Sequence, residues 1–413
     1  MKGACPQASV YLHIPFCFGK CDYCDFYSIS VDPDDPRLSL YVDALIRDAA
    51  SQLAAFGVRE VPTLYIGGGT PSVLGTAAIA RLLDALAALL PPGEREFTVE
   101  ANPESVDRPF LEACRAGGVN RISLGLQSFH DASRRLVNRR GSGADAMEAL
   151  ALSSALFPGS VSADLLSGLP GQDEAQLLRD IDALLAQHPA HVSLYALTLE
   201  DGTPLASRVP ALGSLLPQGE EADALWLAGA QALEAEGYER YEVSNFAQGE
   251  KRSQHNTRYW RMENWLGVGA GASGTVIDDH SGRGLRISVA QDIAAYLENP
   301  ELDSQTVSAC LDSPELEGRF DSSPSVHAIE ELDAATLLKE TCLMGFRYIE
   351  GPDLALVQKR FHRDLGDCIP LSLAKWRRRG FLREDACALT KEGLLFLNPF
   401  LLDVFSELDG YAI

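Results

Sequence analysis

The chain has 413 residues, of which 46% are hydrophobic and 23% are charged, as is ordinary for a globular protein. Its formal net charge of −23 argues against nucleic acid or an anionic membrane surface as the main binding partner. Because one core rarely serves a chain of this length, we expect a large domain and a smaller one.

The cysteine content and the hydropathy pattern predict a compartment. The nine cysteines are odd in number and lack the spacing of a disulfide framework, which fits a reducing environment. No secretory signal pattern precedes the first motif, and no uninterrupted apolar run reaches the roughly 18 residues of a membrane span. We therefore expect a cytoplasmic protein that contacts a membrane only through a partner protein.

Short apolar strands alternate with amphipathic helices through the first half of the chain. The predicted strands are residues 10–14, 61–66, 96–100, 121–126, 160–166 and 191–197. The predicted helices between them are residues 38–56, 79–90, 110–116, 144–156 and 177–186. This alternation predicts an α/β protein with a parallel sheet, open or closed into a barrel, whose sites lie at the carboxyl ends of the strands.

The second half of the chain reads differently. Residues 207–219 are rich in Pro, Gly and Leu and predict a loop, residues 220–237 predict a helix, and residues 303–325 predict a polar linker or insertion. Three further helices are predicted at residues 329–343, 354–361 and 371–381, followed by a turn and a last helix after Leu389. This pattern suggests a smaller, mostly helical, winged-helix-like C-terminal domain. The expected division is 1–300, a linker at 301–328, and 329–413.

Three cysteines stand close together in residues 11–27, which read YLHIPFCFGKCDYCDFY. Cys17, Cys21 and Cys24 follow a C-x3-C-x2-C spacing, and three thiolates on one loop can hold three irons of a cubane cluster while the fourth iron stays open. Two alternatives remain at this point. A zinc site needs a fourth ligand such as His13, and a thioredoxin-like pair leaves Cys17 unexplained.

With its neighbours, this motif resembles the radical S-adenosylmethionine (SAM) superfamily. Within it, YLHIPFC…CDYCDF is similar to the branch of oxygen-independent coproporphyrinogen III dehydrogenases and HemW-type haem chaperones, and the resemblance extends over most of the chain. It implies an incomplete parallel (β/α)6 barrel and a [4Fe-4S] cluster whose open iron binds SAM. A reductant such as flavodoxin or ferredoxin would supply the electron that cleaves SAM to a 5′-deoxyadenosyl radical.

The resemblance also implies a set of SAM contacts at successive strand ends. The glycine run Gly67, Gly68 and Gly69, followed by Thr70, would support the methionine amino group, because glycine lets the backbone approach a ligand closely. The other implied contacts are Tyr11, Tyr23, Glu100, Gln127, Arg139 and Asp164. An arginine suits the SAM carboxylate because its planar guanidinium can pair with two oxygens. Taken singly, each of these residues would be an ordinary surface side chain.

A motif in the second half separates the branches. Residues 255–260 read HNTRYW and match the HNxxYW pattern that the family links to haem binding. The resemblance implies that His255 is an axial ligand of haem iron, with Tyr259 and Trp260 beside the macrocycle. Read without the family, the same residues indicate an aromatic core with a hydrogen-bonded histidine.

Several details favour the chaperone branch. The dehydrogenases carry another cysteine two residues after the third, where this chain has Phe26, and a long N-terminal extension, whereas 16 residues precede Cys17 here. Two departures leave haem ligation beyond His255 open: Ser273 replaces a usual histidine, and Arg140-Gly141 follows Arg139 where a histidine is common. The predicted function is a haem chaperone that passes haem to an acceptor protein. The alternatives are oxidative decarboxylation of coproporphyrinogen III in porphyrin biosynthesis and a non-catalytic iron–sulfur or zinc scaffold.

Overall fold

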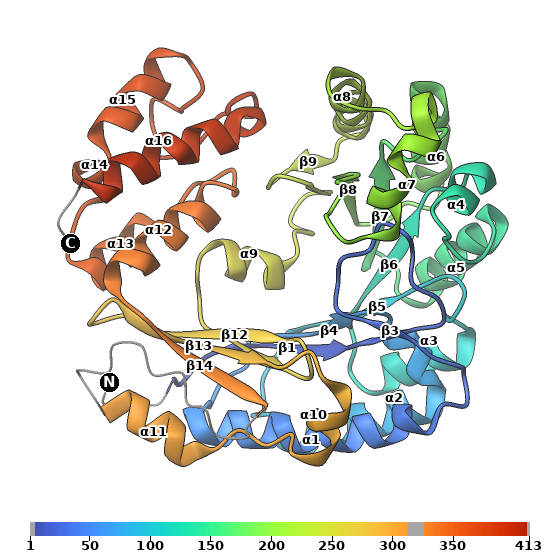
Figure 1. The fold of residues 1–413 in the computed structure, drawn as a ribbon, viewed down its shortest axis with the longest axis horizontal. Coiled ribbons are helices and arrows are strands. Elements are labelled where there is room, and N and C mark those ends of the chain that lie inside the picture. The colour runs from blue at the N-terminus through green and yellow to red at the C-terminus, as the bar shows by residue number, and fades with distance from the viewer. Residues whose placement is uncertain (1–4, 313–325, 411–413) are drawn as a thin grey trace.

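The computed structural model describes residues 5–312 and 326–410, so part of the predicted linker, residues 313–325, lies outside the described residues. Within the described ranges one twelve-stranded sheet runs in the order β14-β13-β12-β11-β1-β4-β5-β6-β7-β8-β10-β9. The run from β11 to β8 is parallel, and its curvature forms an incomplete barrel (Figure 1). A pair of two-residue strands, β2 (Phe16–Cys17) and β3 (Ile29–Ser30), lies apart from it.

The six predicted strands are confirmed. They are β1 (Ser9–Ile14), β4 (Thr63–Gly68), β5 (Glu96–Ala101), β6 (Arg121–Gln127), β7 (Val161–Ser167) and β8 (His191–Ala196). Their apolar side chains are buried because they lie between the sheet and the helices that connect the strands.

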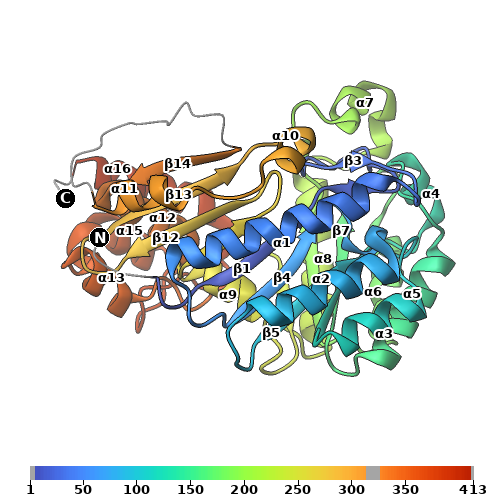
Figure 2. The same cartoon turned by 90° about the horizontal axis from the view of Figure 1, so that it is seen from below.

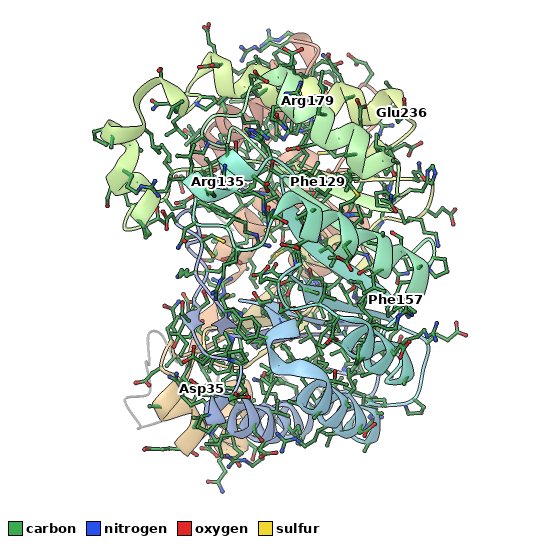
Figure 3. All side chains as sticks on the ribbon, turned by 90° about the vertical axis from the view of Figure 1, so that its right-hand side faces the viewer. Asp35, Phe129, Arg135, Phe157, Arg179 and Glu236 are labelled. Carbon is green, nitrogen blue, oxygen red and sulfur yellow. The ribbon has the colours of Figure 1, made fainter. Side chains whose placement is uncertain are left out.

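Helices cover the outer face of the curved sheet (Figure 2). They are α1 (Pro36–Phe56), α2 (Gly75–Leu89), α3 (Arg108–Ala116), α4 (Asp131–Leu136), α5 (Gly143–Leu156), α6 (Glu174–Leu185) and α8 (Glu220–Ala235). Aspartates fix several of their starts, since the side chains of Asp35, Asp107 and Asp173 accept hydrogen bonds from backbone N–H groups of the first turn. Arg179 and Glu236, which are labelled in Figure 3, lie on this outer helical layer.

One of these helices is apolar enough to attract notice. Pro71–Leu89, which joins the 3-10 turn η1 (Pro71–Leu74) to α2, has the length and composition of a membrane span, with a mean hydropathy of 1.6. In the structure α2 packs between α1 and α3, and Ile79, Leu82 and Leu86 are buried on the face toward the sheet. Packing within the fold buries 39% of the apolar window.

The sheet extends beyond the predicted six strands at both ends. β11 (Trp265–Val268) pairs with β1 in parallel, and the antiparallel strands β12 (Ser273–Asp278), β13 (Arg283–Val289) and β14 (His327–Leu332) continue from it. At the other end β10 (Asn245–Ala247) pairs antiparallel with β8, and β9 (Glu239–Arg240) pairs with β10. As a result β1, which leads into the cysteine loop, is an interior strand with a parallel neighbour on each side.

Two local predictions are wrong. Most of the predicted loop at 207–219 is helical, as α7 (Pro204–Leu212) and the 3-10 turn η2 (Gly213–Leu215), because Thr203 caps the helix and Pro204 occupies its first turn. The helix predicted from residue 329 begins later, as α12 (Ala334–Gly345). The first four residues of the predicted helix, 329–332, belong to β14, which pairs with β13 and has buried residues alternating with exposed ones. Asp333 then caps α12.

The C-terminal helices gather around a second apolar core. After α12 come α13 (Leu354–Phe361), α14 (Leu365–Cys368), α15 (Pro370–Arg378), the 3-10 turn η3 (Gly393–Phe396) and α16 (Leu397–Asp409). Phe400 is central, since its ring meets Phe346 and Trp376 edge-on at centroid distances of 4.6 and 5.5 Å. A single β-bridge joins Leu382 to Leu389. α9 (Gln254–Trp260) contacts both β4 and α12, whereas α10 (Ile293–Glu298) and α11 (Ser304–Asp312) pack against α1, and α11 falls within the predicted linker.

The inner face of the curved sheet carries polar side chains. Because side chains alternate along a strand, Thr63, Tyr65 and Gly67 of β4 share the inner face, and so do Glu100 of β5, Arg121 of β6 and Asp164 of β7. We call the space enclosed by these residues the lumen. The carboxyl ends of the parallel strands form one end of the lumen, and the cysteine loop lies at that end.

Candidate cofactor and haem site

The loop that carries the three cysteines is fastened at several points. Cys17 and Cys21 are buried, and Cys24 is partly exposed. The backbone N–H of Asp22 donates to Val137 at 3.0 Å, and the carbonyl of Asp22 accepts from Leu205 at 2.8 Å. The Asp22 carboxylate also forms an ion pair with Arg208 of α7. The loop is therefore held between the segment after α4 and helix α7.

Two of the sulfur atoms contact polar groups from neighbouring strand ends. The Thr70 hydroxyl lies 3.3 Å from Cys17 Sγ, and Arg139 Nη1 donates to Cys21 Sγ at 3.6 Å. Asn102 links these two groups, because its Nδ2 donates to Thr70 Oγ1 at 2.8 Å and its Oδ1 accepts from Arg139 Nη2 at 2.8 Å. Hydrogen-bond donors directed at sulfur suit an anionic thiolate cluster.

His13 is not available as a zinc ligand in this arrangement. Its Nδ1 lies 2.9 Å from the Tyr11 hydroxyl and its Nε2 lies 2.9 Å from the carbonyl oxygen of Tyr27, so both ring nitrogens are hydrogen-bonded. Burial lowers the pKa of His13, so the ring is neutral. Its role in the structure is to join β1 to the end of the cysteine loop.

The donor set fits a cubane cluster better than a single ion. In residues 5–312 and 326–410, no three His, Cys, Asp or Glu side chains are placed so that they could hold one metal ion. Thiolates of a cubane bind three different irons and stand farther apart than the ligands of one ion. Cys17, Cys21 and Cys24 lie on one anchored loop, and Thr70 and Arg139 contact the sulfurs of Cys17 and Cys21.

The glycine run Gly67-Gly68-Gly69 lies where no larger residue fits. A Cβ on Gly67 would come within 2.8 Å of Glu100, and one on Gly68, which has a φ of +114°, within 2.6 Å of the His13 ring. A Cβ on Gly69 would come within 2.7 Å of the carbonyl oxygen of Phe16. These close approaches bring the backbone of β4 against both the cysteine loop and Glu100.

Glu100 and Asp164 are two acids of the lumen with raised pKa values. Burial raises the pKa of Glu100 to about 7 and that of Asp164 to about 6, and the charge of Asp164 adds to the effect on Glu100. Glu100 is held by two donors, the Tyr65 hydroxyl at 2.7 Å and the backbone N–H of Gly68 at 3.1 Å. These acids therefore change charge close to neutral pH.

Gln127 and Arg139 are brought together at the end of β6. Gln127 has a φ of +70°, an uncommon conformation for a residue other than glycine, at an irregularity in the pairing of β6 with β7. A Cβ on Gly125 would lie 3.1 Å from Gln127 Nε2 and 3.2 Å from Arg139 Nη2, so both side chains crowd this glycine. Strained backbone of this kind is often found at ligand sites.

The two tyrosines of the predicted SAM set occupy different surroundings. The Tyr11 hydroxyl contacts His13, and its ring lies 6.1 Å from that of Tyr65 in the lumen. Tyr23 packs on an apolar cluster formed by Val137, Leu166 and Leu205, beside the cysteine loop. Burial raises the pKa of both hydroxyls, so both are neutral donors.

His255 of α9 enters the lumen from the side opposite the cysteines. Its Nδ1 lies 2.7 Å from the Thr63 hydroxyl, and its ring stacks on Tyr65 at 5.0 Å with an interplanar angle of 28°. Tyr259, one helical turn later, meets the ring edge-on at 4.9 Å. Nε2 is buried and has no hydrogen-bond partner in the described part of the chain. Burial, together with Arg121 and Arg258, lowers the pKa of His255 to about 3.

Trp260 lies apart from His255. The two are five positions apart on α9, so they occupy different faces of the helix. The Trp260 ring packs on Tyr241 and Tyr348, next to the C-terminal helices, and the Arg347 guanidinium lies 5.9 Å above it. The structure thus brings His255 and Tyr259 together and leaves Trp260 at the boundary between the two cores.

Two further residues connect the site and were not singled out by the sequence motifs. Tyr65 stacks on His255 and donates to Glu100, so it joins the HNxxYW motif to the glycine run. Asn102 joins the contacts of Cys17 and Cys21. The alternation of side chains along β4 was a signal that could have found Tyr65, because it places Tyr65 on the same face as Gly67. The sequence holds no such signal for Asn102, whose role depends on contacts between distant segments.

The two positions where this chain lacks an expected histidine have ordinary roles. Ser273 is exposed at the start of β12, and its carbonyl oxygen accepts from Trp265 Nε1 at 3.0 Å. Arg140 donates to the carbonyl oxygen of Phe18 and its side chain covers Gly19, so it supports the cysteine loop. Neither residue lies against His255.

Comparison with known proteins places this geometry in a family. The profile of the radical SAM superfamily matches residues 11–184. The chain is 38% identical over 313 residues to "Heme chaperone HemW" of Escherichia coli K12. The alignment covers 75% of this chain and 80% of that protein. It is 41% identical over 413 residues to the mitochondrial "Radical S-adenosyl methionine domain-containing protein 1" of Bos taurus, covering 97% and 88%.

A solved structure gives the same architecture. The coproporphyrinogen III oxidase HemN from Escherichia coli, a radical SAM enzyme, superposes with a TM-score of 0.74 and covers 97% of this chain and 90% of that one. At 20% sequence identity this likeness shows the fold alone. The fold, the cysteine loop and the two relatives agree, and the chain belongs to the HemW-like family of the radical SAM superfamily.

Proposed function

We propose that this protein is a haem chaperone, which binds haem through His255 and passes it to an acceptor protein. The proposal agrees with the name of its bacterial relative, which is 38% identical. The observation that carries it is the state of His255. A buried imidazole with an unpartnered Nε2 is a neutral ligand ready for iron, because a hydrogen bond from the other nitrogen fixes its orientation.

The surroundings of His255 suit a flat aromatic ligand. Tyr259 and Tyr65 already pack on the imidazole, and aromatic rings of this kind favour contact with a macrocycle. Trp260 belongs to the proposal through its indole Nε1, which is buried and has no partner within the described residues. A donor so placed can serve a ligand that reaches the boundary between the two cores.

Membership of the radical SAM superfamily implies a [4Fe-4S] cluster and SAM as cofactors. We infer that Cys17, Cys21 and Cys24 bind the cluster, which supplies the electron for SAM cleavage when both are bound. The residues that we place around SAM are Tyr11, Tyr23, Gly67, Gly68, Gly69, Thr70, Glu100, Gln127, Arg139 and Asp164. Among them Arg139 would pair with the SAM carboxylate, and ionised Glu100 would accept from its amino or ribose groups.

The partners and the division into domains are part of the same proposal. A haem chaperone needs an acceptor protein, and a cluster that cleaves SAM needs a reductant such as flavodoxin or ferredoxin. We propose a SAM-binding domain over residues 1–300, a linker or insertion at 301–328, and a winged-helix-like C-terminal domain over 329–413. A second apolar core formed mainly by the C-terminal helices supports a separate C-terminal domain, and β14 (His327–Leu332), at the proposed boundary, belongs to the sheet. Nine free cysteines support a reducing compartment, which we take to be the cytoplasm.

His191 provides a matched control for the test of haem ligation. It is a second buried histidine of the lumen, but its ring nitrogens are both partnered, by Ser162 at 2.7 Å and Tyr241 at 2.8 Å. Haem titration followed by absorbance should show that His255→Gln lowers haem affinity at least about tenfold and alters the iron spectrum, as loss of a ligand requires. His191→Gln should leave the iron spectrum unchanged. Iron spectra altered alike in the two variants, or in neither, would contradict the ligand assignment.

An anaerobic assay separates the chaperone from the enzyme. Protein with its cluster reconstituted is incubated with dithionite, SAM and coproporphyrinogen III, and 5′-deoxyadenosine and protoporphyrinogen are measured in the same sample. A chaperone yields no protoporphyrinogen. Formation of protoporphyrinogen in step with SAM cleavage would make the protein a coproporphyrinogen III dehydrogenase and would overturn the proposed function.

A further inference from the structure

A cavity of about 1050 Å³ lies at the end of the barrel opposite the cysteine loop. It is lined where strands β4 to β8 begin, by the segment between α2 and β5, and by the residues just before α9. We call it the basal cavity. Its volume is just above the range of about 300–1,000 Å³ that is typical of pockets for small molecules and cofactors.

Arg121 is the most unusual residue of this lining. It is the first residue of β6, it faces the lumen, and only 9% of it is exposed. In the part of the chain that the structure describes, its guanidinium has no hydrogen bond and no ion pair, and its nitrogens are not among the fully enclosed atoms, so they open on the cavity. Its charge lowers the pKa of Glu100 and Asp164 only from a distance. A guanidinium that opens on a cavity without an ion pair favours an anionic ligand there, so we expect its partner to come from outside the chain.

None of the other charged groups of the lining, which also include Glu94, Glu250 and Lys251, pairs with Arg121 within the described residues. The Glu96 carboxylate accepts from the backbone N–H groups of Gln254 and His255, each at 2.9 Å. Arg252 is paired with Glu350 at 2.6 Å. Arg95 donates to the carbonyl oxygen of Pro91, while its Nη1 is buried without a partner in the described ranges. Two guanidinium groups of one cavity therefore retain free donors.

The lining also has an apolar wall, which includes Leu64, Leu86, Leu90 and Phe97, beside polar residues such as Asn120, Ser160 and Gln254. A cavity that combines such a wall with unpaired guanidinium groups suits a ligand with an apolar body and carboxylate substituents. Inorganic anions would satisfy Arg121 but would leave the apolar wall without a contact. The cavity also adjoins the haem-ligand candidate, because Gln254 lines it and precedes His255 in α9.

We propose that the basal cavity binds a tetrapyrrole by its carboxylate side chains, with Arg121 as their main partner. This inference rests on the proposed function, and it adds to it a route by which haem reaches the lumen from the base of the barrel. The macrocycle contacts the apolar wall, and a carboxylate pairs with the Arg121 guanidinium. The pairing gives this guanidinium the anionic partner that the described residues do not supply.

Ligands that differ only at the carboxylates or the iron give a direct test on the unaltered full-length protein. Haem, its dimethyl ester and metal-free protoporphyrin are titrated in the same solvent and followed by absorbance. We expect the dimethyl ester to bind at least about tenfold more weakly than haem, because a charge-assisted pair is lost. Equal affinity for haem and its dimethyl ester would overturn the basal site while leaving haem binding, and so the proposed function, intact.

Single substitutions test whether the carboxylates of the tetrapyrrole bind at Arg121. Arg121→Gln should weaken haem binding at least about tenfold and abolish the difference between haem and its ester, since only one of them can use the guanidinium. Arg179→Gln removes a charge of the same kind from the exposed outer face of α6 and should change neither (Figure 3). Binding of metal-free protoporphyrin should depend on Arg121 and not on His255. If protoporphyrin binds in this way while haem does not, the proposed function fails and the basal site stands.

Discussion

Asn102 and Arg139 are joined by a hydrogen bond of 2.8 Å between Oδ1 and Nη2, and the other half of the same amide donates to Thr70. Because the amide has one accepting and one donating end, the two contacts fix its orientation. Arg139 and Thr70 in turn meet the sulfurs of Cys21 and Cys17. One side chain thus positions both groups that approach the cysteine loop from the sheet.

The variant Asn102→Ala should therefore disturb the cofactors more than the fold. We expect SAM affinity to fall at least about tenfold and less iron to be retained after anaerobic reconstitution, since Thr70 and Arg139 lose their shared anchor. Titration calorimetry and iron analysis would measure the two effects. Asn120→Ala is the control, because the Asn120 amide likewise bridges two groups. These are the backbone N–H of Phe97 and the carbonyl of Arg95, at the base of β5. If both variants bind SAM alike, Asn102 is merely structural.

Removal of the Tyr65 hydroxyl should change the pH dependence of SAM binding. Its hydrogen bond to Glu100 lowers the pKa of that acid, which burial raises to about 7. In Tyr65→Phe the pKa rises further, so the rise of SAM affinity with pH should move upward by about one unit. Haem affinity should stay the same because the phenyl ring still stacks on His255. An unchanged pH profile would contradict the proposed contact of Glu100 with SAM.

Glu100 should also make stability depend on pH. Its folded pKa of about 7 exceeds the ordinary value of 4.5, so the folded state retains a proton that the unfolded chain releases. This group's contribution to stability therefore falls as pH rises from about 4.5 to about 7. Glu100→Gln should raise the free energy of unfolding at pH 8 by up to about 3 kcal/mol and leave it unchanged near pH 4. Glu236→Gln, on the exposed surface, should show no such difference between the two pH values.

Loss of any cluster cysteine should abolish iron binding. Cys17→Ser, Cys21→Ser and Cys24→Ser each remove one of three thiolates, and serine is a poor ligand for iron in such a cluster. Iron and sulfide per chain after reconstitution should fall close to zero in all three variants. Cys387→Ala removes a partly buried cysteine of the C-terminal region and should retain the wild-type iron content. Substantial iron in any of the three serine variants would contradict the ligand set.

The strands were predictable because each is a short apolar run followed by a helix, and side-chain burial depends on that local pattern. The extension of the sheet was not. β11 has only four residues, and its place beside β1 depends on pairing over more than two hundred positions of sequence. The helix at residues 204–212 was missed because its prolines and the neighbouring glycines are typical of loops. Its capping threonine was the local signal that outweighed them.

For the site, the motifs located the correct strand ends but not the links between them. The glycine run and Glu100 are found in contact, as their positions on adjacent parallel strands suggest. The contact of His255 with Thr63 joins segments that lie far apart in the chain, and a single sequence holds no signal for it. Arg121 was not singled out either, because an arginine at the start of a strand is usually exposed.

The chain order of the site has a consequence for how the protein can diverge. Every residue assigned here to the cluster or to SAM lies between Tyr11 and Asp164, whereas the HNxxYW motif begins only at His255. Within the described residues, Tyr65 contacts both His255 and Glu100. Substitutions between residues 11 and 164 can therefore affect SAM and, through Tyr65 and Arg121, the tetrapyrrole as well, whereas substitutions at 255–260 can change the tetrapyrrole site without altering a residue assigned to SAM.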